Sequence, residues 1–156
     1  MNQPSHVRSV IAAHPFVQGL SDRIVDALAE MADLVEMSAG SWIALQGKPA
    51  HAFHLVTEGR CAIEVATPHR APLVIATVHP GDVLGWSWMF PPHRWHFDVL
   101  AIDTVRTIAI DGDALRNACA TDHELGYEIT RRLAGVVASR LEATRLQLLD
   151  VYGPPR

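Results

Sequence analysis

The residues with the clearest chemical potential lie in one stretch, residues 79–101, which carries three of the chain's four tryptophans. Two glycines, Gly81 and Gly85, open the stretch, and the run Trp86-Ser87-Trp88-Met89 has the length of one helical turn. The backbone N–H groups at the start of a helix are unpaired and attract anions. Arg94 adds a guanidinium that can hold a carboxylate or phosphate through two hydrogen bonds. The stretch therefore has the parts of an anion-binding site beside aromatic rings.

Short strands must position this stretch. Six runs rich in β-branched and aromatic residues are separated by glycine or proline, a pattern that predicts strands and turns. They are Ser41–Gln46, Phe53–Glu58, Arg60–Thr67, Leu73–Val78, His96–Ile102 and Val105–Ile110. We expect a mainly β structure with added α-helices: an antiparallel, jelly-roll-like β-roll of about eight strands, closed so that few strand edges are exposed.

Helices are predicted at both ends of the roll. Residues 21–33 place apolar residues at helical spacing behind a Ser21 cap. Residues 111–113 can cap a short helix, and residues 121–124 resemble the capping box of a long helix that continues to Val151. We therefore expect one domain over residues 1–156. Its helix and roll occupy residues 14–110, and its C-terminal helices occupy residues 111–152.

The long helix carries an apolar seam with alternating spacings of three and four residues, which is typical of helix pairing. The seam is formed by Ala134, Val137, Leu141, Thr144, Leu148 and Val151. A second apolar row, Leu133, Val136, Leu146 and Leu149, faces the roll or widens the seam. Two rows favour a homodimer, and a helix lying on its own domain is the alternative. Arg140 and Arg145 are interpreted as solvated flanks of the seam.

Composition excludes several classes of protein. The net charge is −4, and the basic residues are twelve arginines and Lys48, spread along the chain without a basic stripe. This argues against direct nucleic-acid binding. No apolar run approaches the ~18 residues of a membrane span, and the N-terminus lacks the layout of a signal peptide. Cys61 and Cys119 form no CxxC pair, so we expect neither a disulfide nor a zinc site. These features predict a cytoplasmic protein.

Four segments match one family pattern. They are His14-Pro15-Phe16-x-x-Gly19-Leu20-Ser21, Gly40-Ser41-Trp42-Ile43-x-x-Gln46-Gly47, Ala52-Phe53-His54-Leu55-Val56-x-x-Gly59 and Pro80-Gly81-Asp82-Val83-Leu84-Gly85. Over residues 14–151 the chain resembles the cyclic-nucleotide-binding domain family, of the type of the effector domain of catabolite activator protein. The resemblance implies the roll, a short helix in the phosphate-binding cassette between two strands, here residues 85–98, and a long C-terminal helix.

The cassette departs from the family pattern at two positions. The resemblance places a glutamate for the ribose hydroxyl after the second glycine and an arginine for the cyclic phosphate about nine residues later. Here these positions hold Trp86 and Trp95, while Arg94 lies one position early and Asp98 stands in place of a small residue. An indole donates but does not accept a hydrogen bond, so it cannot accept one from the ribose hydroxyl. We therefore predict that the chain does not bind cyclic AMP in the usual way.

Three interpretations of the cassette stay open. In the first, Arg94 turns inward and binds a cyclic nucleotide or another anion, with Gly85 and Ser87 at the site and Trp86, Trp88 or Trp95 stacked on a ring. In the second, the tryptophans fill the cavity and the chain is a dimerisation or docking module with a partner protein. In the third, the roll holds an unrelated small ligand. Thr144 is a further candidate, because in the family the long helix covers the base.

Catalysis and metal binding have little support. His51-x-x-His54 and His93-x-x-His96 have helical spacing on segments predicted as strand or loop, and no nucleophile elbow is present. We expect no metal, no resident cofactor and no enzyme activity. The sequence ends at Arg156, with no space for the DNA-binding segment that follows the long helix in the family. We therefore expect a stand-alone regulatory or sensor module.

Overall fold

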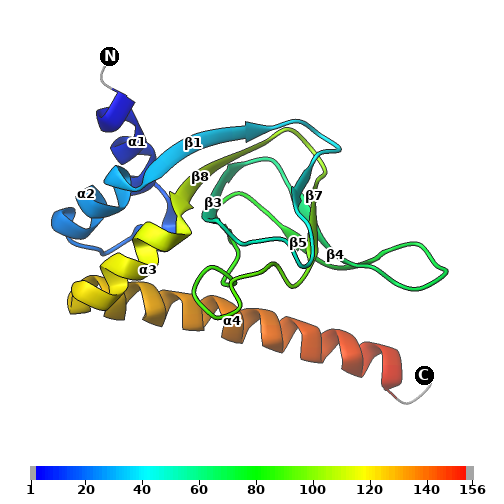
Figure 1. Cartoon of the computed structure of the whole chain (residues 1–156). Coiled ribbons are helices and arrows are strands. Elements are labelled where there is room, and N and C mark those ends of the chain that lie inside the picture. The colour runs from blue at the N-terminus through cyan, green and yellow to red at the C-terminus, as the bar shows by residue number, and fades with distance from the viewer. Residues whose placement is uncertain (1–2, 154–156) are drawn as a thin grey trace.

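The computed structural model describes residues 3–153, and Figure 1 shows a β-roll with helices along one side and a long helix beneath it. Three short helices precede the roll: α1 (Gln3–Ala12), the 3-10 helix η1 (Pro15–Val17) and α2 (Asp22–Glu30). Two helices follow it: α3 (Gly112–Thr121) and α4 (His123–Tyr152). The two ends of the predicted domain, residues 1–2 and 154–156, lie outside the described residues.

Eight strands form the roll as two four-stranded antiparallel sheets, with the orders β1-β8-β3-β6 and β2-β7-β4-β5. The strands are β1 (Ala32–Met37), β2 (Trp42–Ala44), β3 (Ala52–Glu58), β4 (Cys61–Val65), β5 (Leu73–Val78), β6 (Val83–Leu84), β7 (Asp98–Ala101) and β8 (Val105–Asp111). The predicted eight-stranded roll with a long C-terminal helix is confirmed, and each of the six predicted runs contains a strand.

Two strands were not predicted. The helix expected over residues 21–33 ends at Glu30, and β1 begins at Ala32 by pairing with Ile110 of β8. Strand β6 has two residues, which pair with His54 and Leu55. In both cases the strand depends on a partner that is distant in sequence, and local spacing does not report such a partner.

The short helix expected in the cassette is a single turn. Met89 N donates to Trp86 O at 2.9 Å, an i to i+3 hydrogen bond, and no helix is assigned in this segment. Pro91 and Pro92 follow directly and have no backbone N–H to continue a helical ladder. The expected helix is therefore corrected to a turn.

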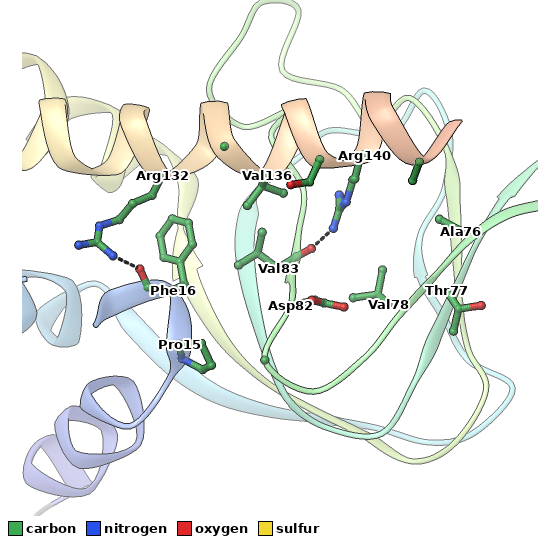
Figure 2. Close-up of a pocket in the computed structure, with 14 residues that line it drawn as sticks. Pro15, Phe16, Ala76, Thr77, Val78, Asp82, Val83, Arg132, Val136 and Arg140 are labelled. Carbon is green, nitrogen blue, oxygen red and sulfur yellow. Dashed lines mark hydrogen bonds between the residues drawn. The ribbon is translucent and has the colours of Figure 1, made fainter. Parts of the chain in front are cut away.

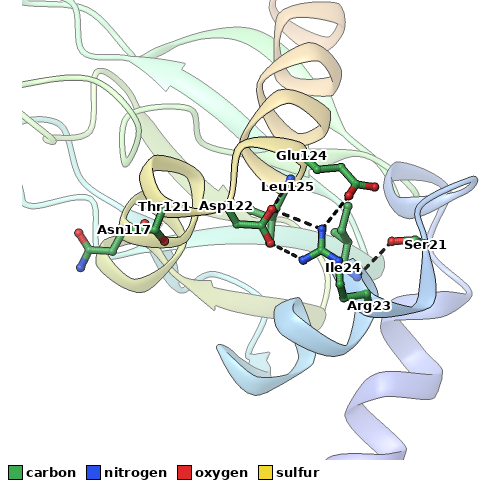
Figure 3. A network of polar contacts seen from close by, with 8 residues as sticks. All are labelled: Ser21, Arg23, Ile24, Asn117, Thr121, Asp122, Glu124 and Leu125. Carbon is green, nitrogen blue, oxygen red and sulfur yellow. Dashed lines mark hydrogen bonds and ion pairs between the residues drawn. The ribbon is translucent and has the colours of Figure 1, made fainter.

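The predicted cap at Asp111 is present, whereas the capping box expected over residues 121–124 is replaced by an Asp122 cap, because Thr121 ends α3 and its hydroxyl donates to Asn117 O. Asp111 Oδ1 accepts from Ala114 N at 2.9 Å, and Asp122 Oδ1 accepts from Leu125 N at 3.2 Å. Figure 3 shows that Asp122 also pairs with Arg23 of α2, which reaches Glu124 at 2.9 Å. These ion pairs join α2 to the start of α4. The Arg23 guanidinium lowers the pKa of the Asp122 carboxyl.

Two apolar cores hold the elements together. The first joins the helices to one sheet, and its fully buried members include Leu28, Phe53, Trp88, Ile108 and Ile129. The second fills the roll with small and branched side chains such as Val56, Cys61, Ile63 and Val99. The two cysteines are free, as expected. The cassette begins inside the roll and passes between these two cores.

Helix α4 has two different halves. In its first half Leu125, Ile129 and Leu133 are buried against the first core. In its second half Leu141 and Val151 are 70% and 73% exposed. In Figure 1 this half runs past the roll toward the C-terminus. The apolar seam predicted from the sequence therefore lies open to solvent along this half of α4.

Candidate functional site

The cassette begins at a glycine that admits a tryptophan ring. Gly85 has φ +91°, a conformation that side chains with a Cβ rarely adopt. A Cβ on Gly85 would lie 2.8 Å from the Trp95 ring. The indole of Trp95 therefore packs directly on the backbone at the point where the cassette leaves β6.

Aromatic rings occupy the interior of the roll at the cassette. The Trp95 ring stacks on His54 with centroids 6.5 Å apart, and the Trp86 ring meets the edge of Phe97 at 6.3 Å. Burial lowers the pKa of His54 to about 4, so its imidazole is neutral at physiological pH. His54 Nδ1 lies 2.9 Å from the hydroxyl of buried Thr107, which supplies its polar partner.

Little space is left among these rings. We call the remaining cavity the inner hollow, and its volume is about 20 Å³. Its lining consists of Ile63, Leu84, Gly85, Trp86, Ser87, Trp95, His96, Phe97, Val99 and Arg140. Small-molecule pockets usually measure ~300 to 1,000 Å³, whereas a single water needs ~10 to 15 Å³. The inner hollow thus has room for about one water.

The structure brings four of the predicted site residues to the inner hollow: Gly85, Trp86, Ser87 and Trp95. The Ser87 hydroxyl lies 3.0 Å from His96 Nδ1. Trp88 points the other way. It is fully buried in the first core, 5.4 Å from the Phe53 ring, and its indole N–H donates to Gly85 O at 3.1 Å. Trp88 is thus a core residue in this structure.

The three remaining predicted residues lie away from the inner hollow. Arg94 is exposed, and its Nη1 donates to Gly47 O at 2.7 Å across the neighbouring turn. Asp98 Oδ1 accepts from Gln46 N at 2.8 Å. The Thr144 hydroxyl donates to Arg140 O of its own helix at 2.9 Å. Each of these polar groups has a partner within the chain.

The guanidinium that borders the inner hollow belongs to Arg140 of α4. Its carbon Cζ lies 5.6 Å from the centre of the Trp86 ring, within cation–π range. Its Nη2 donates to Val83 O. Burial lowers the pKa of Arg140, although Asp82 nearby opposes this effect. Arg140 therefore connects the long helix to the cassette.

The interpretation of Arg140 as a solvated flank is wrong, because this side chain is half-buried, whereas Arg145 is exposed and pairs with Glu142 at 3.3 Å. One signal was available in the sequence. Arg140 lies four residues after Val136, so it continues the apolar row predicted to face the roll.

A much larger hollow lies on the other side of Arg140. We call it the helix groove, and its volume is about 660 Å³. Figure 2 shows α4 above it and η1, β5 and residues 81–83 around the opposite wall. From α4 the lining residues are Arg132, Gly135, Val136, Ser139, Arg140 and Ala143. Arg140 thus separates a filled space from an open one.

The sequence predicted neither a metal site nor a membrane-spanning helix. Within residues 3–153, no group of three or more histidine, cysteine, aspartate or glutamate side chains is arranged to hold a metal ion. None of the described helices is both long and apolar enough to cross a membrane.

Comparison with known proteins identifies the family. The model of the family described as "Cyclic nucleotide-binding domain" matches residues 34–122. The chain belongs to this family. The matched residues include most of the roll and the whole cassette.

A curated relative supports this assignment. The chain is 25% identical over 142 residues to the CRP-like cAMP-activated global transcriptional regulator of Mycobacterium tuberculosis. The alignment covers 91% of this chain and 62% of that regulator. The chain therefore spans less than two thirds of the length of this relative.

Solved structures show the same fold. A cyclic nucleotide-binding domain from Methylobacillus flagellatus KT superposes with a TM-score of 0.79 at 16% identity, over 97% of this chain and 85% of that one. The sensor domain of the transcriptional regulator DNR from Pseudomonas aeruginosa superposes with a TM-score of 0.72 at 18% identity, over 91% of this chain and 95% of that one. The regulatory subunit of a cAMP-independent protein kinase A from Trypanosoma brucei superposes with a TM-score of 0.74 at 15% identity, over 96% of this chain and 52% of that one.

Proposed function

We propose that this chain is a non-enzymatic regulatory module that does not bind cyclic AMP in the usual way, because its own side chains occupy the nucleotide position. The observation that carries the proposal is the volume of the inner hollow, about 20 Å³ between the rings of Trp86, Trp95 and Phe97. A ligand of nucleotide size would have to displace at least one indole. The indoles are partly buried, so displacing one would return apolar ring surface to water and weaken ligand binding.

The polar groups of the cassette support the same proposal. The guanidinium predicted to hold an anion in the roll belongs to Arg94, which is exposed and donates a hydrogen bond to Gly47 O. Asp98, the acid of the cassette, accepts from Gln46 N. Neither residue is among those that line the inner hollow. This favours a filled cavity over an inward-turned Arg94.

For the output of the module we propose a homodimer formed through α4. The second half of the helix exposes large apolar side chains, among them Leu141, Leu148 and Val151 at 70%, 54% and 73% exposure. Pairing with a second copy of the chain would remove this seam from water, and each fully buried leucine or valine contributes ~1.5 to 3 kcal/mol. Such a dimer would transmit a regulatory signal through the position of its long helices.

Ligand binding tests the first part. Millimolar cyclic AMP or cyclic GMP should leave the Tm of the wild type unchanged. Trp95→Ala removes an indole and enlarges the inner hollow, so free indole should raise the Tm of this variant and not that of the wild type. A rise in wild-type Tm with cyclic AMP, together with shifted NMR signals from the amides of Gly85 and Trp95, would contradict the proposal.

Light scattering tests the second part. At tens of micromolar the wild type should have twice the monomer mass of 17.1 kDa, and Leu141→Arg should be monomeric. Glu142→Arg is the matched control, since this exposed position is turned about 100° away from Leu141 on the helix. A monomeric wild type, or equal dissociation by both variants, would rule out the seam as the interface.

A further inference from the structure

The helix groove has the size of a ligand site and is separate from the inner hollow. Its volume of about 660 Å³ lies within the usual range of small-molecule pockets, ~300 to 1,000 Å³. Figure 2 shows its roof formed by one face of α4 and its floor by residues 82–83, with Pro15 and Val78 to the sides. The cassette tryptophans are not among its lining residues.

The groove stays open because small side chains lie on this face of the helix. Gly135, Ser139 and Ala143 follow one another at four-residue intervals, so they stack along one face. A Cβ added to Gly135 would meet no atom within 4 Å. The hollow is therefore a feature of the folded chain that none of its neighbouring side chains fills.

Two arginines line the same face. Arg132 and Arg140 are eight residues apart, which corresponds to about 12 Å along a helix. Arg140 makes one hydrogen bond, to Val83 O, and within residues 3–153 it has no ion pair with a carboxylate. A guanidinium has five N–H donors. Arg140 therefore keeps unused donors in a half-buried position, and the nearby Asp82 carboxylate offsets part of its charge.

Arg132 differs from Arg140 in its partners. Its Nη1 donates to Phe16 O at 2.8 Å. Its Nε is buried and has no hydrogen-bond partner, although the Glu128 carboxylate lies 3.4 Å away. Because this Nε has almost no accessible surface, a ligand in the groove does not reach it, and Arg132 is held by partners within the chain.

The remaining groups define the rest of the ligand. Val136 lies between the two arginines, and Pro15, Phe16 and Val78 make the facing wall apolar. Asp82 is the acid in the lining, and its Oδ2 already accepts from His79 N at 2.9 Å. Arg132 is already paired with Glu128, so Arg140 is the guanidinium of the lining that has no ion pair among residues 3–153. This combination selects an anion that carries an apolar body.

We propose that the helix groove binds a small organic anion, a carboxylate or phosphate attached to an apolar body, with its charged group on Arg140. The seam of α4 is turned about 140° from the groove face on a helical wheel, so a homodimer through the seam leaves the groove open. The site is thus independent of the proposed filled cavity and of the dimer.

Octanoate is a suitable probe, and octanamide is its uncharged counterpart of equal length. In the wild type, octanoate should saturate the NMR shifts of the Gly135, Ser139 and Gly81 amides at least tenfold more tightly than octanamide. Trp86 fluorescence should change in the same titration, because Arg140 lies over its ring. Equal binding of the two probes, or no shift at millimolar octanoate, would overturn the proposal.

Two variants locate the site. Gly135→Leu places a side chain in open space, so it should fold with an unchanged or higher Tm and weaken octanoate binding at least tenfold. Ala138→Leu, an exposed position on another face of α4, is the matched control and should bind as the wild type does. Arg140→Gln should also weaken binding at least tenfold. Unchanged octanoate affinity in folded Gly135→Leu would place binding elsewhere and refute the proposed site.

Discussion

The inner hollow and the helix groove lie on opposite sides of one side chain, yet they differ about thirtyfold in volume, 20 against 660 Å³. On the inner side the cassette contributes Trp86, Trp95 and Phe97, whose rings leave room for about one water. On the outer side α4 contributes glycine, serine and alanine, which leave the space open. Arg140 borders both. Of these two hollows, the one with room for a small molecule therefore lies against α4.

The largest expected effect tests whether the cassette is packed as core. Trp88→Ala removes a side chain that is fully buried against Phe53, and we expect it to lower the free energy of unfolding by about 3 to 5 kcal/mol. Trp42→Ala is the control, because this ring is 48% exposed; we expect a loss below about 1 kcal/mol. Urea denaturation measures both. Similar losses in the two variants would show that the cassette is not packed as core.

The second prediction concerns acid. The pKa of His54 is about 4 in the folded protein and near 6.5 in the unfolded chain. The unfolded chain therefore binds this proton more tightly, and the stability due to His54 is present above pH 6.5 and lost as the pH falls toward 4. The expected loss is about 3 kcal/mol over this window.

His54→Asn isolates this contribution from those of the carboxylates. Asparagine can keep a polar contact with Thr107 and does not titrate, so the stability difference between the two proteins should change between pH 6.5 and 4. His14, whose pKa burial also lowers, is present in both proteins and cancels. If the two denaturation profiles run parallel over this range, His54 is not held neutral beside Trp95.

The smallest effects are expected from replacing one glycine by alanine at each of the two hollows. Gly85→Ala forces φ +91° on alanine and places its Cβ 2.8 Å from the Trp95 ring, which should cost about 1 to 3 kcal/mol. Gly135→Ala meets nothing within 4 Å on a helix, so it should stabilise the protein by up to about 1 kcal/mol. Calorimetry should show a lower Tm for Gly85→Ala and a higher Tm for Gly135→Ala, which would support the comparison. Equal signs would mean that the two sides are packed alike.

Local chemistry was sufficient to predict much of the fold. Ser21 and Asp111 cap helices because their side chains accept hydrogen bonds from N–H groups three residues ahead, a relation contained in the sequence itself. Glycine and proline between β-branched runs likewise predicted six of the strands. Strand β1 was not predicted, because Ala32–Met37 is a strand only through its pairing with β8.

The site was predicted only in part. The resemblance to the family implied that Trp86 and Trp95 stand where its acid and base would be, and both line the inner hollow. The direction in which Trp88 and Arg94 point depends on Phe53 and Gly47, which are distant in sequence. The role of Arg140 arises from the crossing of α4 over the cassette, because its bond to Val83 O spans 57 positions.

The two free cysteines make the chain convenient for spectroscopy. Burial raises the pKa of both Cys61 and Cys119 to about 11, so at neutral pH they are thiols and react slowly with maleimides. A cysteine introduced at exposed Asp150, which is turned about 150° from the seam, would react first, and both native cysteines could stay. A spin label at that position would report the separation of two long helices, and so follow how each ligand changes their arrangement in solution.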